Sequence, residues 1–157
     1  MTGEKLKWGL IANGAIANAF ANSIKNSKTS ELKSVFGRNK SKVEAFAKKH
    51  KIISFNDLDS FLDSDLDAVY IATPHDSHFY YSLKCVRQNL HVLCEKPLTI
   101  NSSESMILIT EAQKRNVFLM EAFMYRCQPQ TFKVLELIEK HFLNKEVKMQ
   151  SSFGFAA

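Results

Sequence analysis

Residues 68–72 (Ala-Val-Tyr-Ile-Ala) form an almost entirely apolar run near the middle of the chain. Such a strand is typical of the centre of a parallel sheet, where helices cover both faces. Segments with a strand pattern and segments with a helix pattern alternate on either side of it, with short connections. This order predicts an α/β fold built on a doubly wound parallel sheet of the Rossmann type.

Periodicity and turn residues give approximate bounds for these elements. Strands are predicted at residues 7–11, 32–36, 52–55, 68–72, 91–94 and 117–122. Helices are predicted at 15–25, 41–50, a short segment near 58–62, about 77–89, 101–115 and 131–142. The predicted caps are Ser41, Asn56 or Asp57, Asp76 or Ser77, and Asn101. Residues 147–155 predict one further long strand with no helix after it.

Composition limits the functional classes. Charged residues make up 24% of the 157, and the net charge of +5 comes from many short segments rather than one block. Solvated helix faces explain that surplus, and a positive field that attracts an anionic ligand is the alternative. No basic run interleaves with aromatic residues, so nucleic acid is not an expected partner. No apolar run is long enough to span a membrane.

The compartment is predicted from the cysteines and the amino terminus. Cys85, Cys94 and Cys127 are odd in number, lie in apolar surroundings and form no Cys-x-x-Cys pair, which predicts buried free thiols in a reducing compartment. The first seven residues are polar and charged, without a signal peptide pattern. The cytoplasm is therefore the expected location.

A glycine-containing turn joins the first strand to the first helix. The dinucleotide fingerprint Gly-x-Gly-x-x-Gly/Ala is matched here by Ala12-Asn13-Gly14-Ala15-Ile16-Ala17, with alanine in place of the first glycine. Gly14 would let the backbone approach a pyrophosphate at the helix amino terminus. The additional methyl group of Ala12 would shift the turn or weaken binding. A tight turn without any ligand is the alternative.

The end of the second strand indicates which dinucleotide would bind. NAD sites usually place Asp or Glu there for the ribose 2′-hydroxyl, but this chain has Arg38, with Lys42 soon after. A guanidinium can bind a 2′-phosphate and stack on adenine, so these residues favour NADP over NAD. Two ordinary surface cations are the alternative.

Three further segments follow strands and are candidates for the same edge of the sheet. Thr73-Pro74-His75 and His78 follow the central strand, with histidines that bond to backbone as the alternative and no additional ligands for a metal site. Glu95-Lys96-Pro97 follows the next strand, where Lys96 could move a substrate proton and Glu95 could tune it, with a surface ion pair as the alternative. Arg126 follows the last strand, with a plain loop cation as the alternative.

Together these residues resemble the Gfo/Idh/MocA oxidoreductase family, most specifically in Glu95-Lys96-Pro97 preceded by Ala72-Thr73-Pro74 and His78. The segment from Phe118 to Arg126, with Pro129, resembles a branch of that family that acts on diols and sugars with NADP. The resemblance implies an NAD(P)-binding Rossmann domain at 1–125. Residues 126–157 would be a linking helix and the first strand of a truncated substrate and dimerisation domain.

The resemblance further implies an NADP-dependent oxidoreductase. It would transfer hydride between nicotinamide and a hydroxyl-bearing carbon of a sugar or cyclic diol. The turn at 12–17 would hold the pyrophosphate, and Lys96 would contact the substrate. Because most of the family's second domain is absent from this sequence, a fragment, a non-catalytic NAD(P)-binding remnant and a subunit that completes a partner's sheet stay open, as does a homo-oligomer formed through the terminal strand.

Overall fold

The computed structural model describes residues 4–142 and, beyond them, only residues 146, 148, 150, 152 and 154. It consists of two units, residues 1–122 and 123–157, which are described separately. The first unit carries the sheet, and the second begins directly after the last strand. The predicted domain boundary at residues 125/126 stays a prediction.

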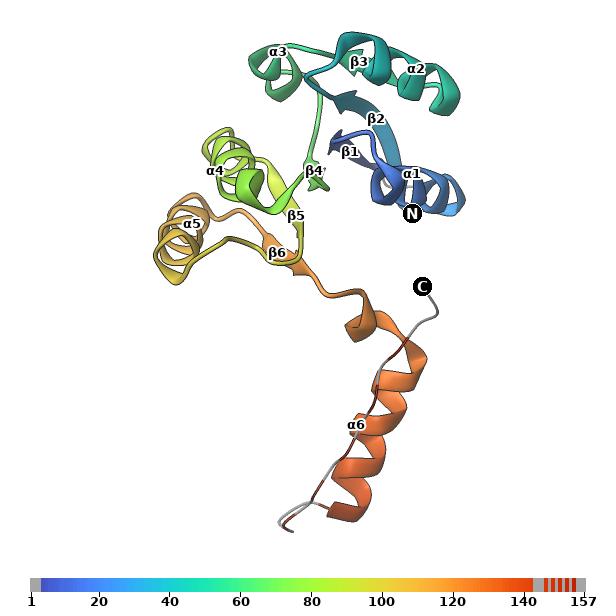
Figure 1. Ribbon diagram of the computed structural model, residues 1–157, viewed down its shortest axis with the longest axis vertical. Coiled ribbons are helices and arrows are strands. Elements are labelled where there is room, and N and C mark those ends of the chain that lie inside the picture. The colour runs from blue at the N-terminus through green and yellow to red at the C-terminus, as the bar shows by residue number, and fades with distance from the viewer. Residues whose placement is uncertain are drawn as a thin grey trace. The chain divides into compact units, whose positions relative to one another are not determined.

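The first unit contains a six-stranded sheet in which every neighbouring pair of strands is parallel (Figure 1). The strand order is β3-β2-β1-β4-β5-β6. The strands are β1 (Leu6–Ile11), β2 (Ser30–Phe36), β3 (Ile53–Phe55), β4 (Ala68–Ile71), β5 (His91–Glu95) and β6 (Leu119–Ala122). The reversal of strand order beside β1 creates a switch point between β1 and β4, where open α/β sheets bind ligands at their carboxyl ends.

Helices cover both faces of this sheet, which confirms the doubly wound fold. The helices of the first unit are α1 (Ala15–Ser23), α2 (Lys40–His50), α3 (Leu58–Leu62), α4 (His78–Arg87) and α5 (Ser102–Arg115), with 3-10 turns η1 (Ile24–Asn26) and η2 (His75–Ser77). One core cluster joins the sheet to α1 and α2, and the other joins it to α3, α4 and α5. All four residues of β4 are buried, as their composition predicted.

The helix caps agree only in part with the sequence pattern. Asp57 and Asn101 cap α3 and α5 through their side chains, as expected. The prediction of Ser41 as the cap of α2 was wrong, because Asn39 has the extended backbone of a cap and its side chain accepts the Lys42 N–H. The helix after β4 begins with the turn η2, and Ser77 makes no side-chain capping bond to α4.

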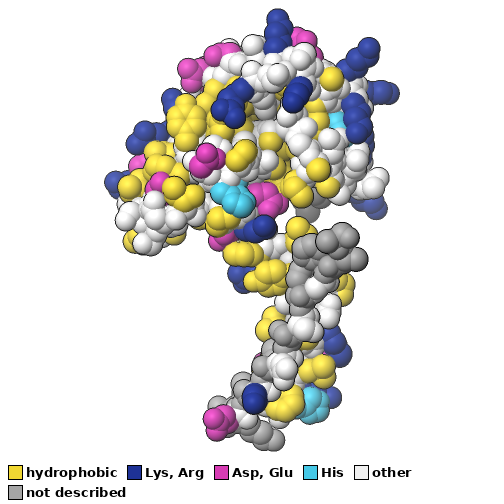
Figure 2. Space-filling model, in the orientation of Figure 1, with side chains coloured by type: hydrophobic (Ala, Val, Ile, Leu, Met, Phe, Trp, Pro, Cys, Tyr) yellow, Lys and Arg dark blue, Asp and Glu magenta, His cyan; other side chains and the backbone are white. Residues whose placement is uncertain are grey.

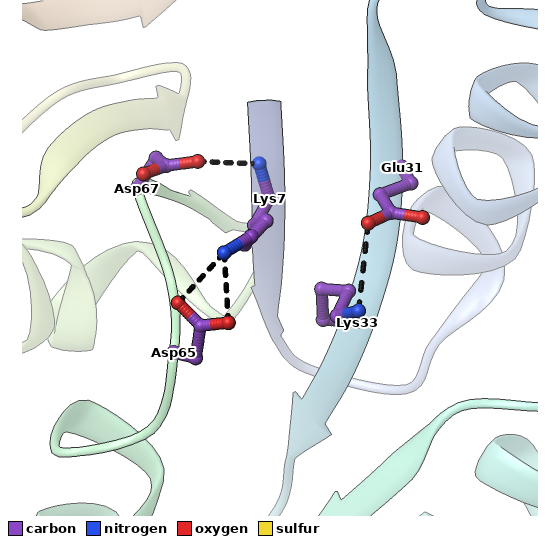
Figure 3. Close-up of polar contacts among 5 residues, drawn as sticks. All are labelled: Lys7, Glu31, Lys33, Asp65 and Asp67. Atoms are coloured by element: carbon purple, nitrogen blue, oxygen red, sulfur yellow. Dashed lines mark hydrogen bonds and ion pairs between the residues drawn. The ribbon is translucent and has the colours of Figure 1, made fainter. Parts of the chain in front are cut away.

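A charged group ties the amino end of β1 to the segment that leads into β4 (Figure 3). The Lys7 ammonium lies 2.9 and 2.8 Å from the two carboxylate oxygens of Asp65, and the Lys7 backbone N–H donates to Asp67 at 2.7 Å. The hydrogen bond and charge of Asp65 raise the pKa of Lys7. This group lies at the end of the sheet opposite the predicted motifs, so it has a structural role.

Figure 2 shows Lys and Arg side chains scattered over the visible face rather than gathered in one patch.

The second unit contains the turn η3 (Met124–Cys127) and the helix α6 (Pro129–Phe142). The apolar spacing of residues 131–142 predicts an amphipathic helix with Val134, Leu135, Ile138 and Phe142 facing inward. That prediction is wrong for the described residues, because α6 has no buried residue and Val134, Leu135 and Phe142 are exposed. An amphipathic pattern indicates an apolar face but not what covers it. Of the predicted strand at 147–155, only residues 148, 150, 152 and 154 are described. The strand, and with it the homo-oligomer, therefore stays a prediction.

The cysteines also differ from expectation at one position. Cys85 and Cys94 are buried free thiols, and burial raises the pKa of Cys94 to about 12, so it is protonated at neutral pH. Cys127 is exposed, so the prediction of three buried thiols was wrong for this residue. Its position beside apolar residues suggested a core, but none of the described residues of α6 is buried. None of the described helices is long and apolar enough to cross a membrane.

Candidate functional site

A pocket of about 270 Å³ opens at the carboxyl edge of the sheet, at the switch point between β1 and β4. Because all six strands are parallel, their carboxyl ends, and the motifs that follow them, meet at this edge. The pocket is lined by Ile11, Ala12, Asn13, Gly14, Phe36, Gly37, Arg38, Ala72, Thr73, Pro74 and Tyr81. Six of these eleven belong to the predicted cofactor set.

The turn after β1 forms one wall of the pocket and has two special positions. Ala12 has a φ of 130°, in the region that favours glycine, and stands where the fingerprint has its first glycine. Its backbone is fixed nonetheless, because its N–H donates to the Phe36 carbonyl at 3.2 Å. Gly14 is the N-cap of α1, and a Cβ added there would meet no atom within 4 Å. The protein's own packing therefore leaves the space above Gly14 open.

The helix that follows this turn is seated tightly on the sheet. Ala17, in the third position of the fingerprint, is fully buried in the core under α1. The Asn18 side chain donates to the Gly14 carbonyl at 3.3 Å. Ala15 and Ile16 are exposed in the first turn and do not line the pocket. Their backbone N–H groups are free for a ligand at the helix amino terminus.

The loop after β2 supplies the only formal charge among the residues that line the pocket. Arg38 is exposed and takes part in none of the ion pairs found among the described residues. Lys42 lies apart from it in a shallower neighbouring hollow, which shares only Asn13 with the pocket. Arg38 and Lys42, which were predicted to act together, therefore lie at different hollows, and of the two only Arg38 borders the pocket.

The histidines after β4 have different environments. His75 is exposed and does not line the pocket. His78 is fully buried, with Nδ1 2.7 Å from the Pro97 carbonyl oxygen and Nε2 2.9 Å from the Thr73 carbonyl oxygen. Carbonyl oxygens only accept, so a ring N–H of His78 donates to one of these two carbonyl groups in either tautomer. The structure favours the alternative in which His78 bonds to backbone, and it joins the loops after β4 and β5.

The loop after β5 is anchored from three sides. The Tyr70 hydroxyl donates to Glu95 Oε1 at 2.5 Å, and the Lys96 backbone N–H lies 3.3 Å from the other carboxylate oxygen. The Leu98 N–H donates to Glu121 on β6 at 2.9 Å, and His78 contacts the Pro97 carbonyl. The Lys96 side chain is exposed and does not line the pocket, although its backbone lies at the same edge. The result is a loop with several anchors, from which the Lys96 ammonium group extends without an ion pair to any described residue.

Tyr70 was missed by the sequence argument. Its ring stacks on Phe20 with centroids 4.3 Å apart, which places it in the core beneath α1. Burial and the hydrogen bond to Glu95 raise the pKa of its hydroxyl, so it stays a donor at neutral pH. A tyrosine in an apolar strand gives no sequence signal for such a bond. Arg126 belongs to the second unit and is not placed relative to this edge. The described residues contain no cluster of His, Cys, Asp and Glu that could hold a metal ion.

Comparison with known proteins identifies the family. The model of the Gfo/Idh/MocA oxidoreductase family, described as having an NAD-binding Rossmann fold, matches residues 6–123. The chain belongs to the Gfo/Idh/MocA family. It is 32% identical over 154 residues to a trans-1,2-dihydrobenzene-1,2-diol dehydrogenase from Xenopus laevis, and 31% identical over 156 residues to the mouse protein of that name. These matches cover 94% and 96% of this chain and 46% of each relative, so the chain spans about half their length.

Solved structures give the same placement. A 3-ketoreductase from Actinomadura kijaniata, in complex with NADP and TDP-benzene, superimposes with a TM-score of 0.82 and is 25% identical. The match covers 87% of this Gfo/Idh/MocA chain and 43% of the ketoreductase. A putative NADPH-dependent oxidoreductase from Desulfitobacterium hafniense superimposes with a TM-score of 0.86 over 91% of this chain and 42% of its own, and its 19% identity supports the fold alone.

The pocket of this Gfo/Idh/MocA chain fits the dinucleotide that its family binds. No protein atom lies within 4 Å of the place where a Gly14 Cβ would stand, so the backbone at this helix amino terminus is open to an approaching phosphate group. Arg38 supplies positive charge on the side of β2, and no carboxylate lines the pocket. The Lys96 loop lies beyond β4 on the other side of the turn. A dinucleotide bound across the edge would therefore extend from Arg38, past Gly14, toward Lys96.

Proposed function

We propose that this chain is the nucleotide-binding part of an NADP-dependent oxidoreductase that acts on a hydroxyl-bearing carbon of a sugar or cyclic diol. The observation that supports it most directly is the pocket itself, which joins the open turn at Gly14 to the charge of Arg38 and has no carboxylate on its walls. The names of the relatives, a diol dehydrogenase and a 3-ketoreductase, support the substrate class. Free buried thiols support a reducing compartment such as the cytoplasm.

Each residue of the proposed site has a distinct task. The turn at Ala12, Asn13 and Gly14 holds the pyrophosphate, and Arg38 pairs with the 2′-phosphate. The bound nicotinamide would supply the hydride chemistry. Lys96 binds the reacting oxygen and passes its proton, while Glu95, held by Tyr70, fixes the loop from which Lys96 extends. Thr73 and Pro74 line the pocket beside β4, between the two ends of the nucleotide.

Fluorescence titration with NADPH and NADH tests the cofactor assignment. NADPH should bind more tightly, and Arg38→Ala should weaken NADPH about 10- to 100-fold while changing NADH little, because a charge-assisted bond to the 2′-phosphate is lost. Equal affinity for the two nucleotides in the unmodified chain would contradict the assignment to NADP. Absence of any binding would contradict the site as a whole.

Gly14→Ala tests the turn independently of the cofactor's phosphate. A methyl group at residue 14 meets no protein atom within 4 Å, so the melting temperature should change little. Affinity for NADPH and NADH should fall together, because both carry the pyrophosphate that this space would hold. Unchanged affinity would mean that the nucleotide does not approach Gly14.

Lys96→Met separates an enzyme from a non-catalytic nucleotide-binding remnant, the alternative that the strained Ala12 turn favours. In an enzyme the variant should lose turnover of sugar or diol substrates and keep NADPH affinity, since Lys96 does not line the pocket. Lys114→Met, at an exposed position of α5, is the matched control and should leave both unchanged. Turnover retained by Lys96→Met would remove the proton role.

A further inference from the structure

Tyr81 forms part of the pocket wall. It is the only lining residue that comes from the body of a helix, since the others belong to strand ends and the loops after them. The residue is 8% exposed, and its ring packs beside Phe36 at the end of β2, with centroids 6.0 Å apart. It therefore lies on the side of the pocket where Arg38 stands.

The hydroxyl group of Tyr81 has no hydrogen-bond partner among the described residues. Tyr70, the other buried tyrosine, donates its hydroxyl to Glu95, whereas no hydrogen bond contributes to the pKa of Tyr81. Buried tyrosines generally pair their hydroxyl groups, because an unpaired polar group is costly away from water. Although it lacks a partner, the Tyr81 hydroxyl is not fully enclosed by protein atoms. Because the hydroxyl is not fully enclosed and Tyr81 lines the pocket, the hydroxyl is available to bond to a ligand bound there.

The charge around this hydroxyl selects the kind of ligand. Burial raises the pKa of Tyr81, and the positive charge of Arg38 opposes that rise, so the hydroxyl lies within electrostatic reach of the guanidinium. No carboxylate lines the pocket, and no ion pair within the described residues neutralises Arg38. A donor hydroxyl and an unpaired cation at one end of a pocket suit an oxyanion with several acceptor oxygens.

We propose that Tyr81 is a specificity-determining residue whose hydroxyl donates a hydrogen bond to the 2′-phosphate that Arg38 pairs with. This rests on the proposed function, which places the adenosine half of NADP on the side of β2. Tyr81 and Arg38 then bind one phosphate from two elements, α4 and the loop after β2. The rigid helical position of Tyr81 orients the phosphate, while Arg38 supplies the charge.

Tyr81→Phe tests this contact, because it keeps the ring that packs beside Phe36 and removes only the oxygen atom. NADPH affinity should fall about 10- to 100-fold, the usual loss for a hydrogen bond to a charged group, and NADH affinity should change less than about twofold. Tyr80→Phe is the matched control, since Tyr80 is the preceding residue of the same helix, is 52% exposed and does not line the pocket. It should leave both affinities unchanged.

The double variant with Arg38→Ala sharpens the test. Because both side chains would bind the same phosphate, the double variant should lose less NADPH affinity than the product of the two single losses. Strictly multiplicative losses, equal losses for NADPH and NADH, or no loss from Tyr81→Phe would each overturn the proposal. If the unmodified chain binds NADPH well and Tyr81→Phe binds equally well, the proposed function stands and this inference alone fails. If the unmodified chain binds neither nucleotide, both fail.

A nuclear magnetic resonance measurement on the unsubstituted chain tests the contact even if Tyr81→Phe fails to fold. With tyrosine labelled at Cζ, NADPH should shift the Tyr81 resonance and NADH should shift it much less, because only NADPH brings a phosphate to the hydroxyl. The resonance is assigned by elimination with single Phe variants of the other tyrosines, Tyr70, Tyr80 and Tyr125. Equal shifts with the two nucleotides would contradict the proposal.

Discussion

Replacing Ala12 by glycine should stabilise the protein. Ala12 has a φ of 130°, and a non-glycine residue held in such a sparsely populated region stores about 1–3 kcal/mol of strain. Glycine removes that strain but makes the unfolded chain more flexible, which costs about 0.4–1 kcal/mol. The free energy of unfolding should therefore rise by about 0.5–2 kcal/mol, which corresponds to about 2–8 °C in melting temperature for a unit of this size.

The structure explains why the strain persists. The Ala12 N–H donates to the carbonyl of Phe36 on one side, and the Ala72 N–H donates to the carbonyl of Ile11 on the other. The turn is thus held between the ends of β2 and β4 and cannot relax without breaking these bonds. Glycine at residue 12 keeps both bonds, because neither involves a side chain.

Urea unfolding and thermal melting of Ala12→Gly measure the effect, with Ala19→Gly as the matched control. Ala19 is exposed within α1, so glycine there should lower the free energy of unfolding by about 1 kcal/mol, the usual difference in helix propensity. Opposite signs for the two variants are the expected result. If Ala12→Gly lowers the stability as Ala19→Gly does, the strain at Ala12 is not real. Because Ala12 also lines the pocket, we expect its glycine variant to bind NADPH more tightly.

Three other changes test the fold. Gly9→Ala should lower the free energy of unfolding by about 1–3 kcal/mol through overpacking, because the new Cβ would lie 2.6 Å from the ring of the fully buried Phe61. Urea unfolding measures this loss, and an unchanged midpoint would contradict the prediction. Asn101→Ala should lower the free energy of unfolding by about 1 kcal/mol, because α5 loses its N-cap. Urea unfolding measures this change as well, and a value near zero would show that the cap does not stabilise the helix. Hydrogen bonds from Ser60 hold the pKa of Asp57 below its usual value in the folded protein. The ionised Asp57 therefore stabilises the fold fully at pH values above its pKa in the unfolded chain, and this stabilisation is lost as the pH falls through its pKa in the folded protein. Asp57→Asn keeps a hydrogen-bond acceptor that does not titrate. Between about pH 5 and about pH 3, the free energy of unfolding of this variant should therefore fall less than that of the unmodified chain. Equal losses would show that Asp57 does not cause this pH dependence.

The sequence allowed the sheet to be predicted well, because the buried strands follow a simple rule. An almost entirely apolar strand such as β4 is stable mainly at the centre of a parallel sheet, where helices cover both of its faces. Details that depend on which of several neighbouring residues takes an extended backbone were harder to predict. Asn39 and Ser41 are both good caps, and only the backbone conformation shows that Asn39 is the one used. The apolar face of α6 was predicted as a pattern, but a pattern does not name the surface that covers it.

The candidate site was predictable where backbone geometry carries it and not where a side chain reaches across the fold. The turn at Gly14 and the loop at Arg38 follow directly from strand ends. Tyr70 and Tyr81 were overlooked, because their rings occupy core positions and have the spacing of any core aromatic residue. Only the three-dimensional arrangement shows that the Tyr70 hydroxyl holds Glu95 and that the Tyr81 hydroxyl has no partner among the described residues.

The two glycines of the first strand and turn show how a structural requirement differs from a ligand's requirement. At Gly9 a methyl group would collide with core side chains, so the fold itself demands glycine. At Gly14 a methyl group would meet nothing, and a φ of −83° is open to any residue, so neither packing nor backbone conformation demands glycine there. A requirement at Gly14 must therefore come from a group outside the polypeptide. If Gly14→Ala leaves both stability and nucleotide affinity unchanged, no such group approaches the turn, and the pocket at this edge is only a gap between strand ends.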